Sequence, residues 1–348
     1  MKRTDRHLPL HLGGALVAVA VACAVPALVA AFLGRHWPLF AIGAATIGGL
    51  VLVTVLVWKV GRWMRTQVPF RIPLTVGQQW GASSAPHSRT GAPRTTGEVM
   101  VRVVLDALCF RPLFRATPTA PAIGRGLSHG MGRSLWWVAA AFHSSLVIVV
   151  ARHLRLFLLP VPGFVEMLER IDVATEMVLP KVHLTSLILP LALALLLVRR
   201  LVLVRVRYIS LAADYFPLLL MLAIAGTGLV TRHFVGTDVA TVKAGFLGLA
   251  NGAPILSTGP DTWLVMHVFL VAVLLAYFPL SKLMHMPGVL MSPTLTMASD
   301  NRERRHLNVR NPEVATLHYS DYEATFRERM IEAGLPVDQP PVGKEGAP

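Results

Sequence analysis

The chain has 348 residues, of which 54% are hydrophobic and only 15% are charged, and its mean hydropathy is +0.57. A soluble domain carries about a quarter charged residues, so this composition argues against an ordinary soluble protein and indicates a membrane protein. The formal net charge of +14 would suit a nucleic-acid-binding protein, but the Lys and Arg residues stand in short clusters beside apolar runs. Such clusters are typical of the cytoplasmic loops of membrane proteins, so we expect no nucleic-acid partner.

Six apolar stretches are long enough to cross a bilayer, since about 20 residues of helix span its hydrocarbon core. We expect an all-α membrane protein whose spanning helices cover residues 12–33, 38–58, 134–158, 183–204, 209–231 and 263–283. The first stretch has a basic start and the small residues Ala22-Cys23-Ala24, which are features of a cleavable signal peptide. Its apolar part is longer than a typical signal core, which favours a retained helix.

The basic residues predict which side of the membrane each loop faces. Residues 59–133 and the short link 199–207 are rich in Lys and Arg, whereas the loop after the third predicted helix carries Glu166, Glu169 and Asp172. Because basic loops face the cytoplasm, we expect a multi-pass protein of the cytoplasmic membrane, surrounded by lipid, with both termini cytoplasmic.

This pattern divides the chain into four parts. Residues 1–58 would form an N-terminal pair of helices, and residues 134–285 a four-helix membrane domain. Residues 59–133 would form a basic cytoplasmic loop, in which residues 99–114 could lie along the membrane surface or pack against a partner subunit. Residues 286–348 form a polar cytoplasmic tail that is too short for a large core of its own, so we expect it to dock on something else.

The cysteines limit the cofactors that this chain could hold by itself. Only Cys23 and Cys109 are present, and no Cys-x-x-Cys or Cys-x-x-Cys-His motif occurs. A c-type haem or an iron–sulfur cluster needs such ligands. Any cofactor of either kind would therefore belong to a partner.

Four of the thirteen histidines lie at membrane depth, namely His143, His153, His267 and His285. Two of them fall in helix 134–158, and two lie in helix 263–283 or at its end. An ionisable residue inside the membrane is costly and indicates function by default. The other histidines, among them His183 and His233 at helix ends, are expected to have ordinary structural roles.

The antiparallel order of the two helices would bring these histidines together in two pairs. His143 and His153 are about 15 Å apart along the helix axis, and His267 and His285 are about 27 Å apart. Because the helices run in opposite directions, His153 should meet His267 near the periplasmic side. By the same order His143 should meet His285 near the cytoplasmic side. The two spacings differ by about 12 Å, of which helix tilt and a bend at Pro279 could absorb a part.

Facing imidazoles can be the two axial ligands of a six-coordinate haem. Four such ligands predict two haem b groups stacked across the membrane. Because both axial positions would be filled, these groups would suit electron transfer rather than oxygen chemistry. Small residues nearby would make room for the flat rings, namely Ala139, Ala140, Ala141, Gly226 and Gly228. Close helix packing explains such small residues equally well.

The ten-residue and eighteen-residue spacings on antiparallel helices resemble those of the gamma subunit of respiratory nitrate reductase, a membrane dihaem b protein that oxidises quinol. The resemblance covers the last four predicted spanning helices. It implies that the fold is the dihaem four-helix bundle of that family. It also implies the ligand pairs His143 with His285 and His153 with His267.

A second resemblance covers most of the chain. Residues 69–79 (PFRIPLTVGQQ), 113–115 (LFR), 282–294 (KLMHMPGVLMSPT) and 322–337 are similar to the DsrM family. This family comprises the haem b membrane subunits of the electron-transfer complex associated with dissimilatory sulfite reductase. It often has a cysteine where this chain has Val76, so any role of that thiol is absent here.

The DsrM resemblance implies a set of partners. They are a cytoplasmic iron–sulfur protein similar to the catalytic subunit of heterodisulfide reductases, a second membrane subunit and a periplasmic cytochrome c. The chain would then pass electrons between the membrane quinone pool, menaquinone or ubiquinone, and the iron–sulfur subunit in dissimilatory sulfur metabolism.

Two basic residues near His153 are candidates for a quinone site. Quinone chemistry moves protons together with electrons, so the headgroup needs a polar partner near the membrane surface. Arg152 is adjacent to His153, and Lys181 begins the fourth predicted helix at the same level. Arg152 could instead bind a haem propionate, and Lys181 could simply extend to the interface.

Other functions fit the sequence less well. A gamma-type cytochrome b subunit of another respiratory complex, such as nitrate reductase, would use the same ligands. A transporter would show an inverted repeat or a polar cluster on a discontinuous helix, and neither is evident. A membrane anchor without redox function would need no paired histidines. We therefore expect a quinol or quinone oxidoreductase subunit.

Overall fold

The computed structural model describes residues 8–33, 37–66, 88–115, 131–173, 183–250, 262–299 and 316–338. All regular structure in these residues is helical, which confirms the predicted fold class. The chain divides into two units, one of residues 1–66 and 71–304 and one of residues 67–70 and 305–348. Residues 69–79 and Lys181 lie outside the described residues.

Among the described helices, six are long and apolar enough to cross a membrane, as predicted. They are α1 (Leu8–Leu33), α2 (Trp37–Arg65), α5 (Met131–His153), α7 (Leu184–Val202), α9 (Ala212–Leu229) and α11 (Thr262–Tyr277). A π-helical segment, η6 (Val230–Val235), continues α9 and ends at Gly236, whose φ is +70°. Large apolar side chains such as Leu50, Val53 and Val57 stay exposed on α2, as a helix that faces lipid requires.

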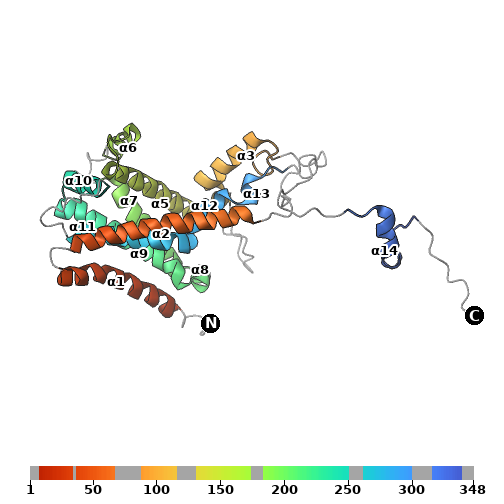
Figure 1. Ribbon diagram of the computed structural model, residues 1–348, viewed down its shortest axis with the longest axis horizontal. Helices are drawn as coiled ribbons and strands as arrows, with labels where there is room; N and C mark the ends of the chain where they lie inside the picture. The colour runs from red at the N-terminus through yellow and green to blue at the C-terminus, as the bar shows by residue number, and fades with distance from the viewer. Residues whose placement is uncertain are drawn as a thin grey trace, which may run out of the picture. The chain divides into compact units, whose positions relative to one another are not determined.

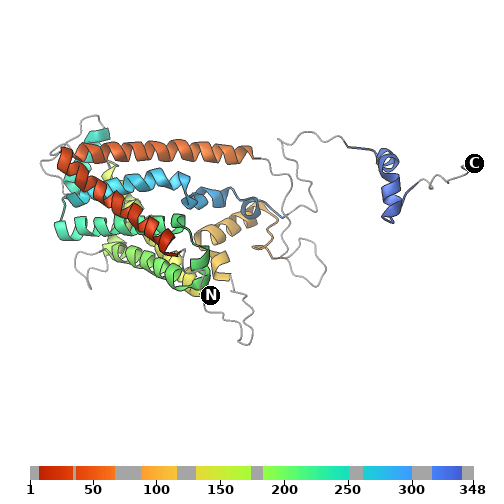
Figure 2. The same ribbon diagram turned by 90° about the horizontal axis from the view of Figure 1, so that it is seen from below.

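The spanning helices pack side by side within the first unit (Figure 1; Figure 2). Helix α11 packs against α2 and α9, α7 packs against α5 and α9, and α1 lies on α9. Gly48 permits the close contact of α2 with α11, because a Cβ at this position would lie 2.6 Å from the carbonyl oxygen of Ala272. Small residues at such crossings are how membrane helices approach each other.

The contact of α5 with α7 forms the buried core of the bundle. Phe142 on α5 packs there against Leu189, Ala192 and Leu193 of α7. In the described part of the chain, α5 and α11 are not a closely packed pair. These are the two helices that carry His143, His153 and His267, and they approach each other through histidine side chains.

Helix α11 ends at Tyr277, earlier than the apolar run predicts. Pro279 has no N–H to donate, and the chain continues as the 3₁₀ turns η7 (Phe278–Leu280) and η8 (Lys282–Met284). Two short helices follow, α12 (His285–Leu290) and α13 (Pro293–Thr296). His285 therefore does not stand on the straight continuation of α11, which explains how its eighteen-residue spacing fits a partner spacing of ten.

Short helices complete the first unit: α3 (Thr96–Val103), η3 (Val104–Leu108), α4 (Arg111–Arg115), η4 (Leu154–Leu156), α6 (Gly163–Val173), α8 (Val204–Ile209) and α10 (Val239–Ala250). Helix α3 begins at a capping box, in which the Thr95 side chain and the Glu98 carboxylate satisfy each other's backbone N–H groups. Helices α5 and η6 finish at the same end of the bundle at which α7 and α11 begin, and we call this the His153 end. We call the opposite end the His285 end.

In the second unit, the described residues form helix α14 (Tyr319–Glu332) and the segment that follows it. The buried Glu323 carboxylate accepts a hydrogen bond from the backbone N–H of Asp338, and the Tyr319 hydroxyl donates to the carbonyl of Pro336. The chain after α14 therefore folds back onto this helix.

Candidate functional site

The structure brings the four candidate histidines together in the two pairs expected from the antiparallel order. The ring centroids of His143 and His285 are 6.3 Å apart, and their planes are inclined at 89°. The ring centroids of His153 and His267 are also 6.3 Å apart, but their planes are inclined at only 21°. Neither distance permits a direct hydrogen bond between ring nitrogens, so the two rings of each pair are not bonded to each other.

Every one of the four rings is oriented by a hydrogen bond from Nδ1 to a backbone carbonyl. The acceptors for His143, His153, His267 and His285 are Ala139 (2.7 Å), Val149 (2.7 Å), Ile224 (3.0 Å) and Lys282 (3.0 Å), respectively. A carbonyl oxygen only accepts, so Nδ1 carries the proton and the Nε2 lone pair is available to a metal. Within the described residues, Nε2 makes no hydrogen bond in any of the four.

Helix α9 places Thr227 and Gly228 beside the ring of His267. The Thr227 hydroxyl oxygen lies 3.1 Å from His267 Nδ1, and it donates its own proton to the carbonyls of Ala223 and Ile224. A Cβ at Gly228 would lie 3.1 Å from Cε1 of His267, so this glycine gives the ring its place. Gly226, also expected to make room, has open space around its Cβ position in the described chain. Thr227 was not singled out in the sequence, where it is one hydroxyl in an apolar helix.

His143 stands on a regular helix, but aromatic side chains surround its ring. The rings of Phe142 and Phe110 both lie 4.8 Å from that of His143. Phe110 reaches the ring from the link between η3 and α4, where its φ is +53°. The Trp136 indole N–H donates to the carbonyl of Cys109 and fastens this link to α5. The predicted surface segment 99–114 therefore packs in part against a candidate ligand.

His285 is held in place by contacts with other segments, because α12 is a short helix at the end of the spanning region. Its neighbour Met284 is buried, and Trp63 of α2 lies 3.9 Å from the Cβ position of Gly288. The Lys59 ammonium group donates to the carbonyl of Pro279. Helix α2 thus supports the segment on both sides of His285.

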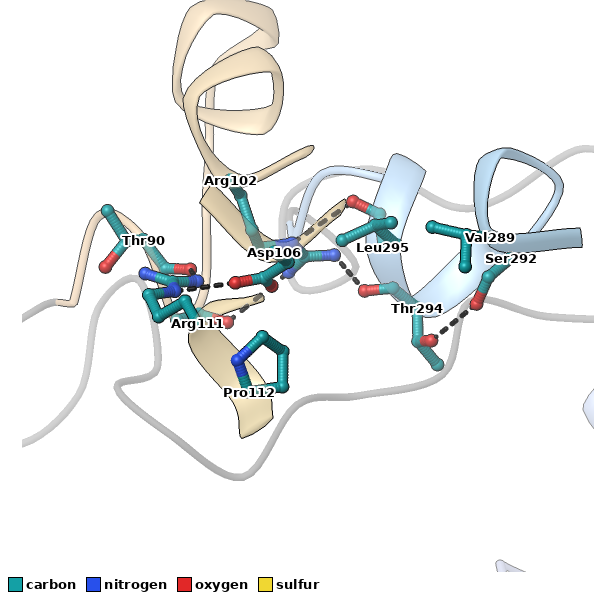
Figure 3. A pocket seen from close by; sticks show the side chains of 10 residues that line it. Thr90, Arg102, Asp106, Arg111, Pro112, Val289, Ser292, Thr294 and Leu295 are labelled. Carbon is teal, nitrogen blue, oxygen red and sulfur yellow. Dashed lines mark hydrogen bonds and ion pairs between the residues drawn. The ribbon is translucent and has the colours of Figure 1, made fainter. Parts of the chain in front are cut away.

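A buried arginine also fastens this segment to α3. Arg102 is 3% exposed and donates to the carbonyls of Thr294, Leu295 and Gly91 (Figure 3). Burial lowers the pKa of its guanidinium, the charge of Asp106 raises it, and that of Arg111 lowers it. We call Arg102 and its three acceptors the Arg102 clasp. The clasp ties the segment 90–111 to the chain that follows His285.

Next to the clasp lies a pocket of 440 Å³, which Figure 3 shows between the segment 90–112 and the chain from α12 to α13. Arg111 closes one side of it, with bonds to Asp106 (2.6 Å) and to the carbonyl of Thr90 (2.9 Å). All the charged groups of this pocket are therefore paired within the chain.

Arg152, a predicted quinone residue, forms an ion pair at the His153 end. Its Nη1 lies 2.6 Å from the buried carboxylate of Asp172 and 3.4 Å from the Thr185 hydroxyl. Thr185 in turn donates to Asp172 from its hydroxyl and from its backbone N–H. This network joins α5, α6 and α7, so Arg152 has a structural role, and its role at a quinone site stays a prediction.

His183, which the sequence places at a helix end with no special role, is buried in the structure. It is 5% exposed, and neither ring nitrogen has a hydrogen-bond partner. Burial and the charges of Arg152 and Arg232 lower the pKa of His183 to about 4, while Asp172 and Glu169 oppose this change. His183 is therefore neutral near pH 7. The sequence offers no signal for this, because the surrounding charges come from three other helices.

In the described residues, no group of three or more His, Cys, Asp and Glu side chains could hold a metal ion by itself. The two histidine pairs therefore suit a metal whose other ligands come from elsewhere, as haem iron takes four from its porphyrin.

The comparisons with known proteins agree with this architecture. Residues 130–297 match the family described as nitrate reductase gamma subunit. A protein of Archaeoglobus fulgidus called Hdr-like menaquinol oxidoreductase cytochrome b-like subunit is 37% identical over 285 residues, which cover 79% of this chain and 84% of that relative. A protein of the same name from Archaeoglobus profundus is 36% identical over 297 residues, which cover 82% of this chain and 84% of that relative.

The fold defines an integral membrane protein, and its histidine pairs lie inside the region that matches the nitrate reductase gamma subunit family. More particularly, the chain belongs to the family of the Hdr-like menaquinol oxidoreductase cytochrome b-like subunits.

Proposed function

We propose that this chain is the dihaem cytochrome b subunit of a membrane quinol or quinone oxidoreductase complex. One haem b would be held by His153 and His267, and the other by His143 and His285. The observation that carries this proposal is the pair of 6.3 Å separations between facing imidazoles whose Nδ1 atoms all donate to backbone carbonyls. The names of the relatives, which contain both cytochrome b and menaquinol oxidoreductase, support it.

The separation fits axial ligation of a single iron. A bond from a metal to an imidazole nitrogen is about 2 Å long, and the ring centre lies about 1 Å beyond the nitrogen. Two axial ligands on one iron would therefore place their ring centres about 6 Å apart. When bound, each haem supplies a one-electron carrier. The residues of this chain would hold its iron from both sides, fix the imidazole tautomer and keep the site in an apolar bundle.

The quinone site stays a prediction, with Arg152 and Lys181 as its candidate residues. The guanidinium of Arg152 is at the level of His153, as such a site requires, although one of its nitrogens is bonded to Asp172. Lys181 lies outside the described residues. The names of the relatives favour menaquinone as the quinone of this family.

We further propose that the chain works beside a cytoplasmic iron–sulfur subunit similar to heterodisulfide reductases. The "Hdr-like" part of the relatives' name supports this partner, and so does the absence of cluster-binding cysteine motifs in the sequence. A DsrM-type role in dissimilatory sulfur metabolism, with another membrane subunit and a periplasmic cytochrome c, rests on the sequence resemblance. The clustering of Lys and Arg supports the cytoplasmic membrane as location and a cytoplasmic position of both termini and of the His285 end.

The test is the haem content of the purified complex. We expect two haem b per copy of this chain in a pyridine haemochrome assay, and the sharp alpha bands of six-coordinate haem b in the reduced spectrum. A protein of correct fold that contains one haem or none would contradict the proposal.

A further inference from the structure

Charged and imidazole side chains from α5, η4, α6, η6 and the start of α7 lie at the His153 end. Two ion pairs lie there, Arg152 with Asp172 and Arg155 with Glu169. Arg232, on η6, is exposed, and within the described part of the chain it pairs with no carboxylate. Arg232 therefore has no described carboxylate within ion-pair distance.

Two imidazoles near Arg152 and Arg232 have buried nitrogens without hydrogen bonds. Both ring nitrogens of His183 and Nε2 of His233 lack a partner. His183 is 5% exposed, so water does not replace the missing partners freely. A buried polar group without a hydrogen bond is destabilising, which is why such groups call for an explanation. The unbonded nitrogens belong to two imidazoles that each lie within the influence of the positive charges of Arg152 and Arg232, which points to a bound anion.

The position of this group relates it to the histidine pair at the same end. Arg152 directly precedes His153 on α5. Arg232 follows Gly228 by four residues, about one helical turn, and the Cβ position of Gly228 lies 3.1 Å from the ring of His267. The arginine therefore lies one turn beyond the ring, on the side of the bundle surface. A ligand held between His153 and His267 would therefore lie close to this group.

We propose that Arg232, His183 and His233 form the binding site for a propionate carboxylate of the haem held by His153 and His267. The inference rests on the proposed function, since it requires a haem in this pair. A carboxylate offers acceptor positions on two oxygens, an arginine offers a fork of N–H donors that matches them, and each neutral imidazole offers one further N–H. Arg152 is bonded to Asp172, so Arg232 supplies the charge.

Redox titration of the purified complex tests this assignment. A cation beside a haem favours the reduced state, which carries one positive charge fewer, so Arg232→Gln should shift one of the two haem components to lower potential. His183→Phe, which keeps a ring but removes both nitrogens, should move the same component. The matched control is Arg170→Gln, which removes an exposed positive charge from α6. Unchanged potentials of both haems in Arg232→Gln and His183→Phe, with full haem content, would overturn the assignment.

A second experiment leaves Arg232, His183 and His233 unchanged and alters the ligand instead. The His143→Ala complex, which would keep only the haem of His153 and His267, is produced without haem and reconstituted with haem or with haem dimethyl ester. The ester has no anionic carboxylates, so we expect haem to bind at least about tenfold more tightly. Equal affinities would overturn the inference and leave a lipid phosphate as the anion. If His153→Ala left the haem content of the complex unchanged, the proposed function itself would fail.

Discussion

The two ends of the bundle build their histidine pairs in different ways. At the His153 end, both rings stand on regular spanning helices, and α9 supplies Gly228 and Thr227 beside His267. At the His285 end, only His143 stands on a spanning helix, and α12 brings His285 from a chain that has already left α11. A pair on spanning helices is fixed by the packing of the bundle itself. A pair completed by a short helix depends on whatever holds that helix, here α2 and the Arg102 clasp.

The largest expected effect comes from removing the rings, and it tests whether the two pairs are separate sites. His267→Ala should remove about half of the haem b in the complex, because it takes one axial ligand from one site only. His285→Ala should remove the other half, and His153→Ala should give the same spectrum as His267→Ala. The measurement is a pyridine haemochrome assay together with the reduced spectrum, and the control is His318→Ala, which alters an exposed histidine just before α14. If His143→Ala and His267→Ala removed the same component, the pairing would be wrong.

Substitution of Arg102 should sharpen the comparison, because the clasp serves only one end. Arg102→Met leaves up to three backbone carbonyls without their donor, at about 1–3 kcal/mol for each one that stays buried. We expect the haem of His143 and His285 to be released at a lower temperature, while the other haem is released as before. Thermal release followed at the alpha bands measures this.

The control for Arg102→Met is Arg89→Met, which alters an arginine whose side chain is 82% exposed. Equal loss of both haems in Arg102→Met would mean that the clasp supports the whole bundle and not one end of it.

Gly228→Ala is the corresponding change at the His153 end. The added methyl group would lie 3.1 Å from the His267 ring, which must move by a few tenths of an ångström. Overpacking of this kind costs about 1–3 kcal/mol, and we expect it to alter the spectrum and stability of the haem of His153 and His267 alone. Gly43→Ala on α2, whose Cβ would have no neighbour within 4 Å among the described residues, is the control. An effect on the other haem would contradict the prediction that the two ends are independent.

The smallest effect should come from Thr227→Val, which keeps the shape of the side chain and removes its hydroxyl. His267 Nδ1 then retains only the Ile224 carbonyl as acceptor. Because hydrogen bonds to Nδ1–H raise the basicity of a ligating imidazole and stabilise the oxidised metal, we expect a slightly higher midpoint potential for this haem at unchanged haem content. A redox titration of both components would detect it, and an unchanged potential would show that the Thr227 contact is too weak to matter.

The sequence predicted what depends on period and composition. The apolar runs predicted six spanning helices, and the spacing of His143 and His153 against His267 and His285 predicted which rings would meet. These features are readable because a helix has a fixed rise and the membrane has a fixed thickness.

The remaining features depend on contacts between distant segments, for which no local pattern exists. In the sequence, Arg102 is simply one arginine of a basic loop. Its role follows from contacts with Thr294 and Leu295, which lie almost two hundred residues later in the chain. His183 is one histidine before an apolar helix until α5, α6 and η6 surround it. Helix α11 ends at Tyr277 although the apolar run continues beyond it. Pro279 interrupts the helical hydrogen bonding but is itself apolar, so hydropathy does not mark this helix end.

The inclination of the ring planes has a spectroscopic consequence. In oxidised low-spin haem, each axial imidazole donates electron density perpendicular to its plane and so separates two of the iron d orbitals in energy. Rings that are nearly parallel, as His153 and His267 are at 21°, act in the same direction and separate these orbitals widely. Rings that are nearly perpendicular, as His143 and His285 are at 89°, oppose each other and leave the orbitals almost degenerate. If two haems bind as proposed, they should therefore give different electron paramagnetic resonance signals, a rhombic one and a strongly anisotropic one, so that each can be followed separately in the same sample.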